Sequence, residues 1–310
     1  MPNQPPAEVV DWAEQRATAR QDKDFATADE LRQRIVDAGW LLTDTPDGFE
    51  LTEAPPFAVL ERLTDLPDRS QEPDTHPVSA LLVVDGWPDD VRTCVESLLQ
   101  HGPAQLRVVA LDVGNVDDAG AVLEELAAAS DRVSVFHVNA PAGWGPAVTA
   151  LLRTDTATAQ VILDLSSVLT GDAITPLAEA LTGDVVAAGW RGVNVNLQDD
   201  WRSFVDADAG EVDALLGYLL AVRRDAAAAT PPNRKARFYR NADMEWSLLL
   251  REAGGRLVQP VAADELPVRQ ERHHGYHDSD PEYREVESKR TYDRLLKRFR
   301  GRDGLLAPRP

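Results

Sequence analysis

Two stretches decide the predicted fold, Val78-Ser-Ala-Leu-Leu-Val-Val-Asp-Gly-Trp87 and Leu106-Arg-Val-Val-Ala-Leu-Asp112. Each is a short continuous apolar run that leads into an aspartate, which is typical of strands buried on both faces of a parallel sheet. Residues Pro88 to His101 between them predict a helix that makes a right-handed crossover. Ligands bind at the carboxyl ends of such strands, so Asp85 and Asp112 are expected to face a ligand.

Length and composition set limits on what the chain can be. It has 310 residues, 43% of them hydrophobic, and a formal net charge of -20, so nucleic acid is not expected as a broad partner. The lone Cys94 excludes an internal disulfide framework and is interpreted as a buried structural thiol. No apolar run is long enough to span a membrane, and Met1 to Pro6 lack the pattern of a secretory signal. A cytoplasmic location is therefore expected, with peripheral attachment to a membrane as the alternative.

The middle of the chain alternates between strand and helix patterns. Further strands are predicted at 133–139, 161–164, 185–191, 221–224 and 257–260, and further helices at 119–130, 143–153, 172–181 and 238–253. This alternation predicts an α/β domain over residues 78–277. That span is long enough for a single core.

Two smaller parts flank this domain. Residues 1–70 predict a small helical module, with helices at 6–20 and 23–38, a short hairpin around the turn Asp44-Thr-Pro-Asp-Gly48, and a short helix at 57–66. Residues 71–77 predict a linker. Residues 278–310 predict a basic C-terminal helix and tail, in which 282–302 carry eight Lys or Arg against four Asp or Glu. The module and the tail are candidate surfaces for a protein partner or a membrane.

The small module resembles a segment of a known enzyme class. The run Arg20-Gln-Asp-Lys-Asp-Phe-Ala-Thr-Ala-Asp-Glu-Leu-Arg-Gln-Arg-Ile35, the following Ala38-Gly-Trp40 and the turn Asp44 to Gly48 resemble the C-terminal segment of cysteinyl-tRNA synthetases. The nucleotide-binding signatures and zinc ligands of that enzyme are absent. The module is therefore interpreted as a packing or protein-contact element, with an RNA contact as the alternative.

The large domain carries several short motifs in a characteristic order. They are Val108 to Asp117, Asn139 to Pro146, Val161 to Ser166, Gly217 to Arg224, Ala242 to Gly254 and His273 to His277. In order and spacing these segments resemble the family 2 glycosyltransferases, which have the GT-A fold. The resemblance implies a mixed, mainly parallel sheet with flanking helices, and the possible activity of a hexosyltransferase.

The resemblance also implies roles for particular residues. Donor-nucleotide contacts fall on Asp85, Asp112, Gly114, Asn115, Gly143 and Asp164; ligands of Mg²⁺ or Mn²⁺ fall on Asp164, Ser166, His273 and His274; the catalytic base is Asp243. A divalent cation prefers carboxylate oxygens and accepts a histidine. An inverting transfer needs a carboxylate to take the proton of the acceptor hydroxyl. The competing interpretations are that Asp243 only caps its helix and that the histidines lie in a solvated loop.

The sequence departs from the family pattern at three positions. Ser166 stands where a second metal-binding carboxylate is usual, Ala242 where a glutamate is common, and Asp85 where a neutral polar residue is usual. Three hypotheses follow. The chain transfers a sugar from a nucleoside diphosphate sugar to a hydroxyl of a glycan or lipid-linked acceptor; or it is an inactive scaffold or binding protein of the same fold; or its module contacts RNA.

Overall fold

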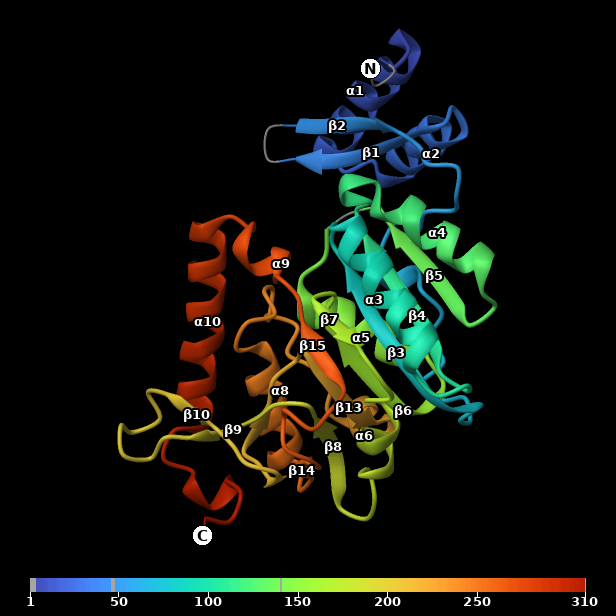
Figure 1. Ribbon diagram of the computed structural model, residues 1–310. Coiled ribbons are helices and arrows are strands. Elements are labelled where there is room, and N and C mark those ends of the chain that lie inside the picture. The colour runs from blue at the N-terminus through green and yellow to red at the C-terminus, as the bar shows by residue number, and fades with distance from the viewer. Residues whose placement is uncertain (1–3, 46–47, 140, 310) are drawn as a thin grey trace. The chain divides into compact units, whose positions relative to one another are not determined.

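The computed structural model describes residues 4–45, 48–139 and 141–309, which form two compact units (Figure 1). The units are Met1–Glu61 and Arg62–Pro310, so the boundary lies earlier than the predicted residue 70. Residues 62–77, expected to end the module and form a linker, belong to the larger unit. Leu66 is buried there, and the Arg224 guanidinium donates to the carbonyls of Arg69 and Glu72. The helix predicted at 57–66 is reduced to the single 3-10 turn η1 (Leu63–Asp65).

The smaller unit consists of α1 (Ala7–Gln21), α2 (Phe25–Asp37) and the hairpin β1 (Trp40–Thr45) and β2 (Gly48–Glu53). The tip of the predicted turn, 46–47, lies outside the described residues. The helices and hairpin share a core of Val9, Ala13, Ile35, Trp40 and Leu42. A paired hydrogen bond from Arg16, which is only 2% exposed, to Asp44 fastens α1 to β1. Phe25 has the spacing of the apolar face of α2, but it is the first residue of that helix and is exposed, whereas Ala28, Leu31 and Ile35 are buried.

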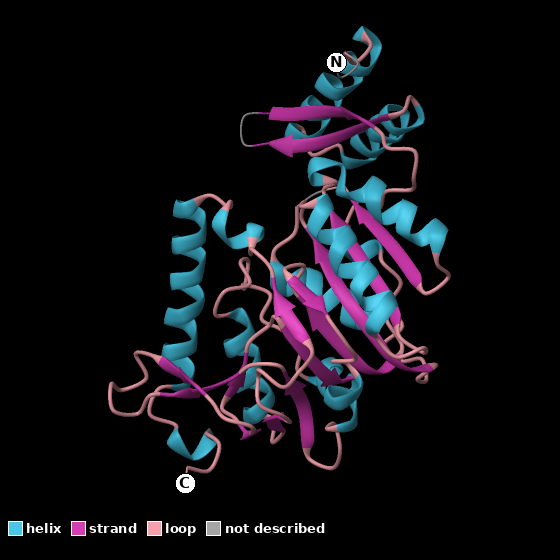
Figure 2. Cartoon of the chain, viewed as in Figure 1, coloured by secondary structure: helices cyan, strands magenta, loops and turns pink. Residues whose placement is uncertain are grey.

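One eight-stranded sheet organises the larger unit (Figure 2). Its strands are β3 (His76–Val84), β4 (Arg107–Val113), β5 (Val133–Val138), β6 (Ala157–Leu163), β8 (Val185–Gly189), β11 (Gly210–Glu211), β13 (Leu219–Arg223) and β14 (Arg256–Gln259). Their order is β11-β14-β8-β13-β6-β3-β4-β5. Strands β6, β3, β4 and β5 are parallel, as are β8 and β14, whereas β13 runs antiparallel between β6 and β8. The predicted mixed, mainly parallel α/β fold is confirmed.

Helices cover both faces of this sheet. They are α3 (Pro88–His101), α4 (Ala119–Ala129), α5 (Trp144–Thr154), α6 (Thr175–Glu179), α7 (Arg224–Ala229) and α8 (Ala242–Glu252). Helix α3 lies in front of β3 and β4 in Figure 1, and α4 packs against β5. Leu98 of α3, Leu123 of α4 and Leu82 of β3 belong to one buried core. Cys94 of α3 is fully buried there, which agrees with a structural thiol, and burial raises its pKa. Helix α8 begins four residues later than predicted, which places Asp243 in its first turn.

Among the shorter elements, β10 (Phe204–Asp206) lies where residues 199–205 predict a loop with a strand, and the others were not predicted from the sequence. Strands β9 (Gly192–Val195), β10 and β12 (Ala214–Leu215) form a three-stranded sheet, and β7 (Ser167–Leu169) pairs with β15 (Val268–Gln270). The β7–β15 pair brings the chain back from β14 to the end of β6, next to Asp164. The short helix α9 (His274–His277) and the turn η3 (Asp303–Leu305) complete the unit.

The predicted basic C-terminal helix is α10 (Pro281–Phe299), and it packs against α8. Leu295 and Phe299 are fully buried in the contact. Arg294 forms a paired hydrogen bond to the buried Glu245, and Arg298 pairs with Glu252. Two arginines of α10 are therefore already paired with carboxylates of α8.

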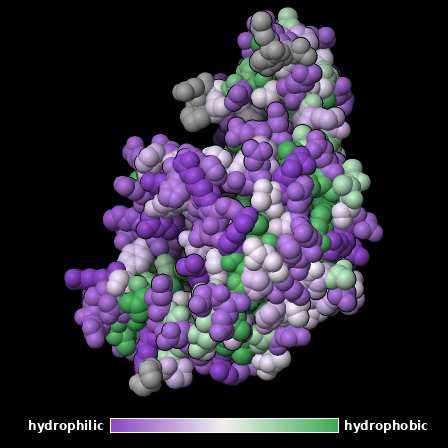
Figure 3. Space-filling view, viewed as in Figure 1, coloured by the Kyte–Doolittle hydropathy of each residue, from purple (hydrophilic) through white to green (hydrophobic). Residues whose placement is uncertain are grey.

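No helix among the described residues combines the length and apolarity needed to cross a bilayer. The face in Figure 3 is mainly hydrophilic, with small apolar areas between the charged side chains.

Candidate active site

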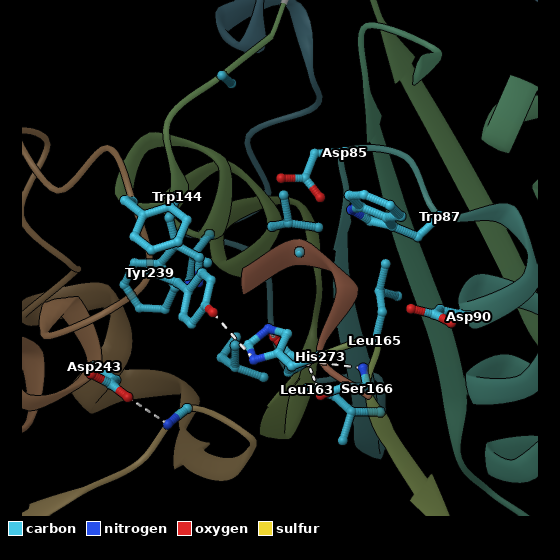
Figure 4. A pocket seen from close by; sticks show the side chains of 18 of the residues that line it. Asp85, Trp87, Asp90, Trp144, Leu163, Leu165, Ser166, Tyr239, Asp243 and His273 are labelled. Atoms are coloured by element: carbon cyan, nitrogen blue, oxygen red, sulfur yellow. Dashed lines mark hydrogen bonds and ion pairs between the residues drawn. The ribbon is translucent and has the colours of Figure 1, made fainter. Parts of the chain in front are cut away.

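A pocket lies at the carboxyl ends of β3 and β6, where the sequence predicted ligands to bind (Figure 4). It is lined by Val83, Asp85, Trp87, Asp90, Ala142, Trp144, Val148, Ile162, Leu163, Asp164, Leu165, Ser166, Gly217, Arg237, Phe238, Tyr239, Asp243, His273 and Gly275. Its free volume is ≈ 90 Å³. Ligand pockets are typically about 300 Å³ or larger, so the side chains in this pocket leave little open space.

Asp164 occupies the end of β6, where the buried run Val161 to Leu163 stops. Its backbone N–H donates to the Tyr218 carbonyl at 3.2 Å. Its Oδ1 accepts the backbone N–H and the hydroxyl of Ser166, and its Oδ2 lies 3.0 Å from His273 Nε2. Burial alone would raise the pKa of Asp164, but the hydrogen bond and charge of His273 outweigh burial and lower that pKa below its usual value. The pocket therefore holds a carboxylate anion at neutral pH.

His273 connects Asp164 to a tyrosine. The imidazole is 9% exposed, and its Nδ1 lies 3.2 Å from the Tyr239 hydroxyl. In the neutral tautomer that donates from Nε2 to Asp164, Nδ1 accepts the proton of Tyr239. Burial raises the pKa of Tyr239, which keeps this hydroxyl protonated. Asp164, His273 and Tyr239 form one hydrogen-bonded row across the pocket. Figure 4 shows the bond between Tyr239 and His273.

Asp243 lies on the other side of the pocket, in the first turn of α8. It is 9% exposed, and its two carboxylate oxygens accept the backbone N–H groups of Gly217 and Met244, each at 2.8 Å. Burial raises the pKa of Asp243 to about 6, against the lowering effect of these hydrogen bonds. A carboxyl group with such a pKa exchanges protons readily near neutral pH.

Asp85 also lines the pocket, beyond the end of β3. Asp85 is exposed at the surface, but desolvation of its carboxyl group, together with the charge of Asp164, raises its pKa. Asp90, in the first turn of α3, lines the same pocket, and burial raises its pKa too. Four aspartates therefore line one small pocket.

Four residues predicted to contact the nucleotide, Asp112, Gly114, Asn115 and Gly143, are not among those that line the pocket. Asp112 is 0% exposed; its Oδ1 accepts the Asn115 N–H at 3.0 Å, and its Oδ2 lies 2.8 Å from His137 Nδ1. Gly114 has φ +95°, and Asn115 accepts the Gly120 N–H at 3.0 Å. These contacts shape the turn between β4 and α4. A direct nucleotide contact from Asp112 would require this turn to open.

His137 gives this turn a pH-dependent stability. Burial lowers its pKa, but hydrogen bonds to Asp112 and Glu124 outweigh burial and raise that pKa overall. A raised folded-state pKa stabilises the protein fully below the unfolded value of about 6.5, and this stabilisation is lost as the pH rises through the folded pKa. We expect His137→Leu to cost roughly 2 kcal/mol at pH 6 and less at pH 9, measured by denaturant unfolding. Equal costs at both pH values would contradict this, and His101→Leu is the control.

Gly143 and Gly145 hold a neighbouring loop against α5. The Trp144 N–H donates to the Arg237 carbonyl at 2.9 Å, and the Gly145 N–H donates to the Ala236 carbonyl at 2.8 Å. A Cβ on Gly143 would lie 2.9 Å from Arg237 Cα, and one on Gly145 would lie 2.2 Å from the Asn233 carbonyl oxygen. The glycines are needed because residues 233–241, called here the cationic loop, approach the helix closely.

We expect Gly145→Ala to displace the cationic loop. The added methyl group cannot coexist with the Asn233 carbonyl, and overpacking of this kind costs about 1–3 kcal/mol. Thermal unfolding should detect the loss, and limited proteolysis should cleave between 233 and 241 more rapidly. Gly304→Ala, where an added Cβ meets nothing within 4 Å, is the matched control. If both variants unfold alike, the loop does not depend on this contact.

His274 does not line the pocket, although the adjacent His273 does. Its Nδ1 lies 2.7 Å from Asp278 Oδ2, and its ring stacks on Trp87 with centroids 5.6 Å apart. The two adjacent histidines, predicted together as metal ligands, are thus placed in different surroundings.

Comparison with known proteins identifies the fold. The family model described as Glycosyl transferase family 2 matches residues 85–246. The chain belongs to this family. The match begins at Asp85 and ends in α8, so it spans the pocket from β3 to the helix that carries Asp243.

A solved structure has a fold similar to that of this chain. The crystal structure of GalNAc-T7 with UDP, GalNAc and Mn²⁺ gives a TM-score of 0.58 at 13% identity, covering 72% of this chain and 48% of that chain. The chain therefore spans about half the length of GalNAc-T7, and the likeness shows the fold. A mannosyltransferase, PcManGT from Pyrobaculum calidifontis in complex with GDP-Man and Mn²⁺, gives a TM-score of 0.47 at 15% identity, covering 67% of this chain and 59% of that one.

The small module has its own relative. A cysteine–tRNA ligase of Opitutus terrae (strain DSM 11246 / JCM 15787 / PB90-1) is 55% identical over 49 residues, which is 16% of this chain and 11% of the ligase. The similarity covers far too little of the ligase to carry its activity.

The side chains that could bind a divalent metal ion in this pocket meet the needs of Mg²⁺ or Mn²⁺ only in part. Asp164 and His273 supply a carboxylate and an imidazole on one side of the pocket. Over the described ranges, no group of three or more His, Cys, Asp or Glu is arranged to hold a metal ion. Mg²⁺ commonly takes one or two protein ligands and completes its shell with water and substrate phosphates. The pair therefore fits a half-site that a nucleotide diphosphate would complete.

Sequence reasoning missed several residues of the pocket, namely Trp87, Asp90, Trp144, Arg237 and Tyr239. The glycines on either side of Trp144 were a signal, because two glycines around an aromatic residue indicate a close backbone approach. Tyr239 was missed because the helix was predicted to start at Phe238, which made Tyr239 part of a regular helix; Arg237 lies just before that predicted start and had no signal of its own.

Proposed function

We propose that this chain transfers a sugar from a nucleoside diphosphate sugar to an acceptor hydroxyl, with inversion at the anomeric carbon. Asp243 removes the proton of the acceptor hydroxyl as its oxygen forms a bond to the anomeric carbon. The bond from that carbon to the diphosphate breaks in the same step, and the nucleoside diphosphate leaves with the electron pair. The acceptor is expected to be a glycan or a lipid-linked sugar.

One observation carries the proposal: a buried aspartate with a pKa of about 6 lines the same pocket as the Asp164–His273 pair. A helix cap alone does not require burial inside a ligand pocket. The Asp243 carboxylate accepts one N–H of the first turn of α8, from Met244, and one from Gly217 outside the helix, so it stabilises the helix start as well as facing the pocket. These hydrogen bonds hold the carboxylate in one orientation, which a general base needs.

The same proposal assigns Mg²⁺ or Mn²⁺ to Asp164 and His273. When bound, the cation would neutralise the negative charge of the departing diphosphate. His273 would then bind through Nε2 and donate its Nδ1 proton to the Tyr239 hydroxyl, since ligating histidines usually donate their other N–H to a neighbour. Ser166 carries no charge; its hydroxyl donates to Asp164 and so orients that carboxylate.

The small free volume means that the donor enters only when the pocket opens. Tyr239 belongs to the cationic loop and His273 to the segment before α9, and both project into the space a nucleotide needs (Figure 4). We expect the segment that carries His273 to move away from the cationic loop on binding. Trp144, the first residue of α5, lines the same pocket, so nucleotide binding should change tryptophan fluorescence.

The second candidate function is binding of a nucleotide or partner without transfer. It is favoured by Ser166, which leaves one carboxylate fewer at the metal half-site than the family pattern has. An RNA contact through the small unit is disfavoured, because residues 1–61 carry thirteen acidic and five basic side chains. Membrane or protein binding through the small module and α10 stays a prediction.

Calorimetric titration with UDP- and GDP-sugars, with and without Mn²⁺, separates these functions. Transfer requires binding of at least one sugar nucleotide, strengthened by Mn²⁺, followed by release of the nucleoside diphosphate in the presence of an acceptor. Binding without release of the diphosphate would support the second candidate. Failure to bind any sugar nucleotide would overturn both.

A further inference from the structure

The cationic loop has an unusual charge for this chain. Residues 226–242 contain Arg234, Lys235, Arg237 and Arg240 and no aspartate or glutamate, although the whole chain has a net charge of -20. All four side chains are exposed. In the part of the chain that the structure describes, no ion pair is formed by any of them, whereas Arg224, Arg251 and Arg294 each pair with a carboxylate. The loop therefore presents uncompensated positive charge.

The backbone of this loop is fixed on both sides. Its hydrogen bonds to Trp144 and Gly145 hold residues 236 and 237 against α5. At the other end, Asn233 Oδ1 accepts the Lys235 N–H at 3.0 Å and Asn233 Nδ2 donates to Glu245 Oε1 at 3.0 Å. Glu245 is itself buried and bound by Arg294. Charges on a fixed backbone lose less entropy when they bind a ligand than charges on a mobile segment do.

Two of the four charges lie at neighbouring cavities, whereas Arg240 donates to the Tyr276 hydroxyl. Arg237 lines the pocket that contains Asp243. Arg234 lines a second cavity of ≈ 350 Å³, in which Arg153 is paired with Asp68 and Arg234 forms no ion pair with any described residue. Val148 of α5 lines the first cavity and Thr149 lines the second, so the cavities lie on adjacent faces of one helix. The loop therefore passes over the start of α5 from one cavity to the other.

We propose that the cationic loop recognises a phosphate group carried by the acceptor. The inference rests on the proposed transfer function and names the class of acceptor. Arginine binds phosphate oxygens through two parallel hydrogen bonds, and a neighbouring lysine adds a compact charge. The acceptor is favoured over the donor because Arg237 lies six residues before Asp243, the proposed base, and because Arg234 reaches a cavity beyond the pocket. The donor diphosphate has its own place at Asp164 and His273.

The test compares phosphorylated with neutral acceptor fragments. The protein is saturated with UDP or GDP and Mn²⁺, and tryptophan fluorescence is titrated with glucose 1-phosphate, glucose, farnesyl phosphate and farnesol. We expect at least one phosphorylated probe to bind tenfold or more tightly than its neutral partner. A preference for farnesyl phosphate indicates a lipid-linked acceptor, and a preference for glucose 1-phosphate indicates a soluble or polymeric sugar phosphate.

The variant Arg234→Gln/Lys235→Gln/Arg237→Gln should lose this preference and keep its affinity for the nucleoside diphosphate. Arg202→Gln/Lys289→Gln/Lys297→Gln removes the same charge from exposed positions outside both cavities and should keep the preference. The single variant Arg237→Gln serves if the triple variant does not fold. Equal binding of charged and neutral probes, or no binding of either phosphate, would overturn the proposal. Loss of nucleotide affinity in the triple variant would place the loop on the donor side instead, and failure of nucleotide binding in the unaltered protein would count against the transfer function itself.

Discussion

Asp243→Asn is expected to lower turnover by about 10²–10⁴-fold while leaving the affinity for the sugar nucleotide nearly unchanged. Asparagine has almost the same shape but cannot accept a proton at neutral pH. Because the pKa of Asp243 is about 6, activity of the unaltered protein should rise with pH through that value. Initial rates across pH 5 to 8, together with calorimetric affinity, test both statements. Retention of turnover would show that Asp243 only caps α8.

The same substitution has a second, independent signature in stability. Burial raises the folded-state pKa of Asp243 above the ordinary value of about 3.9 for an aspartate. Its contribution to the free energy of unfolding is therefore complete below that ordinary value and is lost as the pH rises through about 6. Ionisation of Asp243 then lowers the free energy of unfolding by on the order of 3 kcal/mol, and Asp243→Asn removes part of this destabilisation because asparagine carries no charge. The unfolding free energy of the unaltered protein relative to Asp243→Asn should therefore increase when the pH falls from 7.5 to 5.

A suitable control is Asp172→Asn. Asp172 Oδ1 accepts the backbone N–H groups of Ile174 and Thr175 at the start of α6, outside the pocket. It shares the capping role of Asp243 without the pocket, so its substitution should leave turnover and its pH profile unchanged.

His273→Asn is expected to reduce turnover by about 10²-fold and to weaken Mn²⁺ binding by about 10–100-fold. The reason is the position of Nε2, 3.0 Å from Asp164 Oδ2 in the same pocket. Mn²⁺ affinity is measured by electron paramagnetic resonance in the presence of a nucleoside diphosphate, which reads the metal without relying on activity.

His274→Asn provides the matched control from the adjacent residue. His274 contacts Asp278 and Trp87 instead of Asp164, so Mn²⁺ affinity should not change. If the two variants behave alike, the assignment of the metal half-site to His273 fails. If Asp164→Asn binds Mn²⁺ as well as the unaltered protein, the half-site itself fails.

The parallel half of the sheet could be predicted because its sequence signals are local. Continuous apolar runs mark β3, β4 and β6, and the helix predicted at Pro88 to His101 has those bounds in the structure. The second half was harder, since β9, β10 and β12 are two to four residues long and depend on non-local pairing. Segments of this length are too short to show the alternation of apolar and polar residues that identifies a strand.

The site was predicted in part for similar reasons. Asp164 could be predicted because it follows a strand, and Asp243 because it lies at the start of a helix. Both line one pocket. Asp112 had the same local pattern but is enclosed by His137 and Asn115, and only the folded chain reveals those partners. His273 and His274 could not be distinguished by position, because α9 begins between them.

The antiparallel strand β13 gives the two central carboxylates a common anchor. Tyr218, just before this strand, accepts the Asp164 N–H through its carbonyl, and the adjacent Gly217 donates its N–H to Asp243. The spacing of the two acids is therefore set by two consecutive residues of the sheet margin, independently of the loops that close the pocket. Replacement of the segments at 233–241 and 268–277 by other sequences would therefore change which molecules enter the pocket, while the distance between Asp164 and Asp243 would be kept.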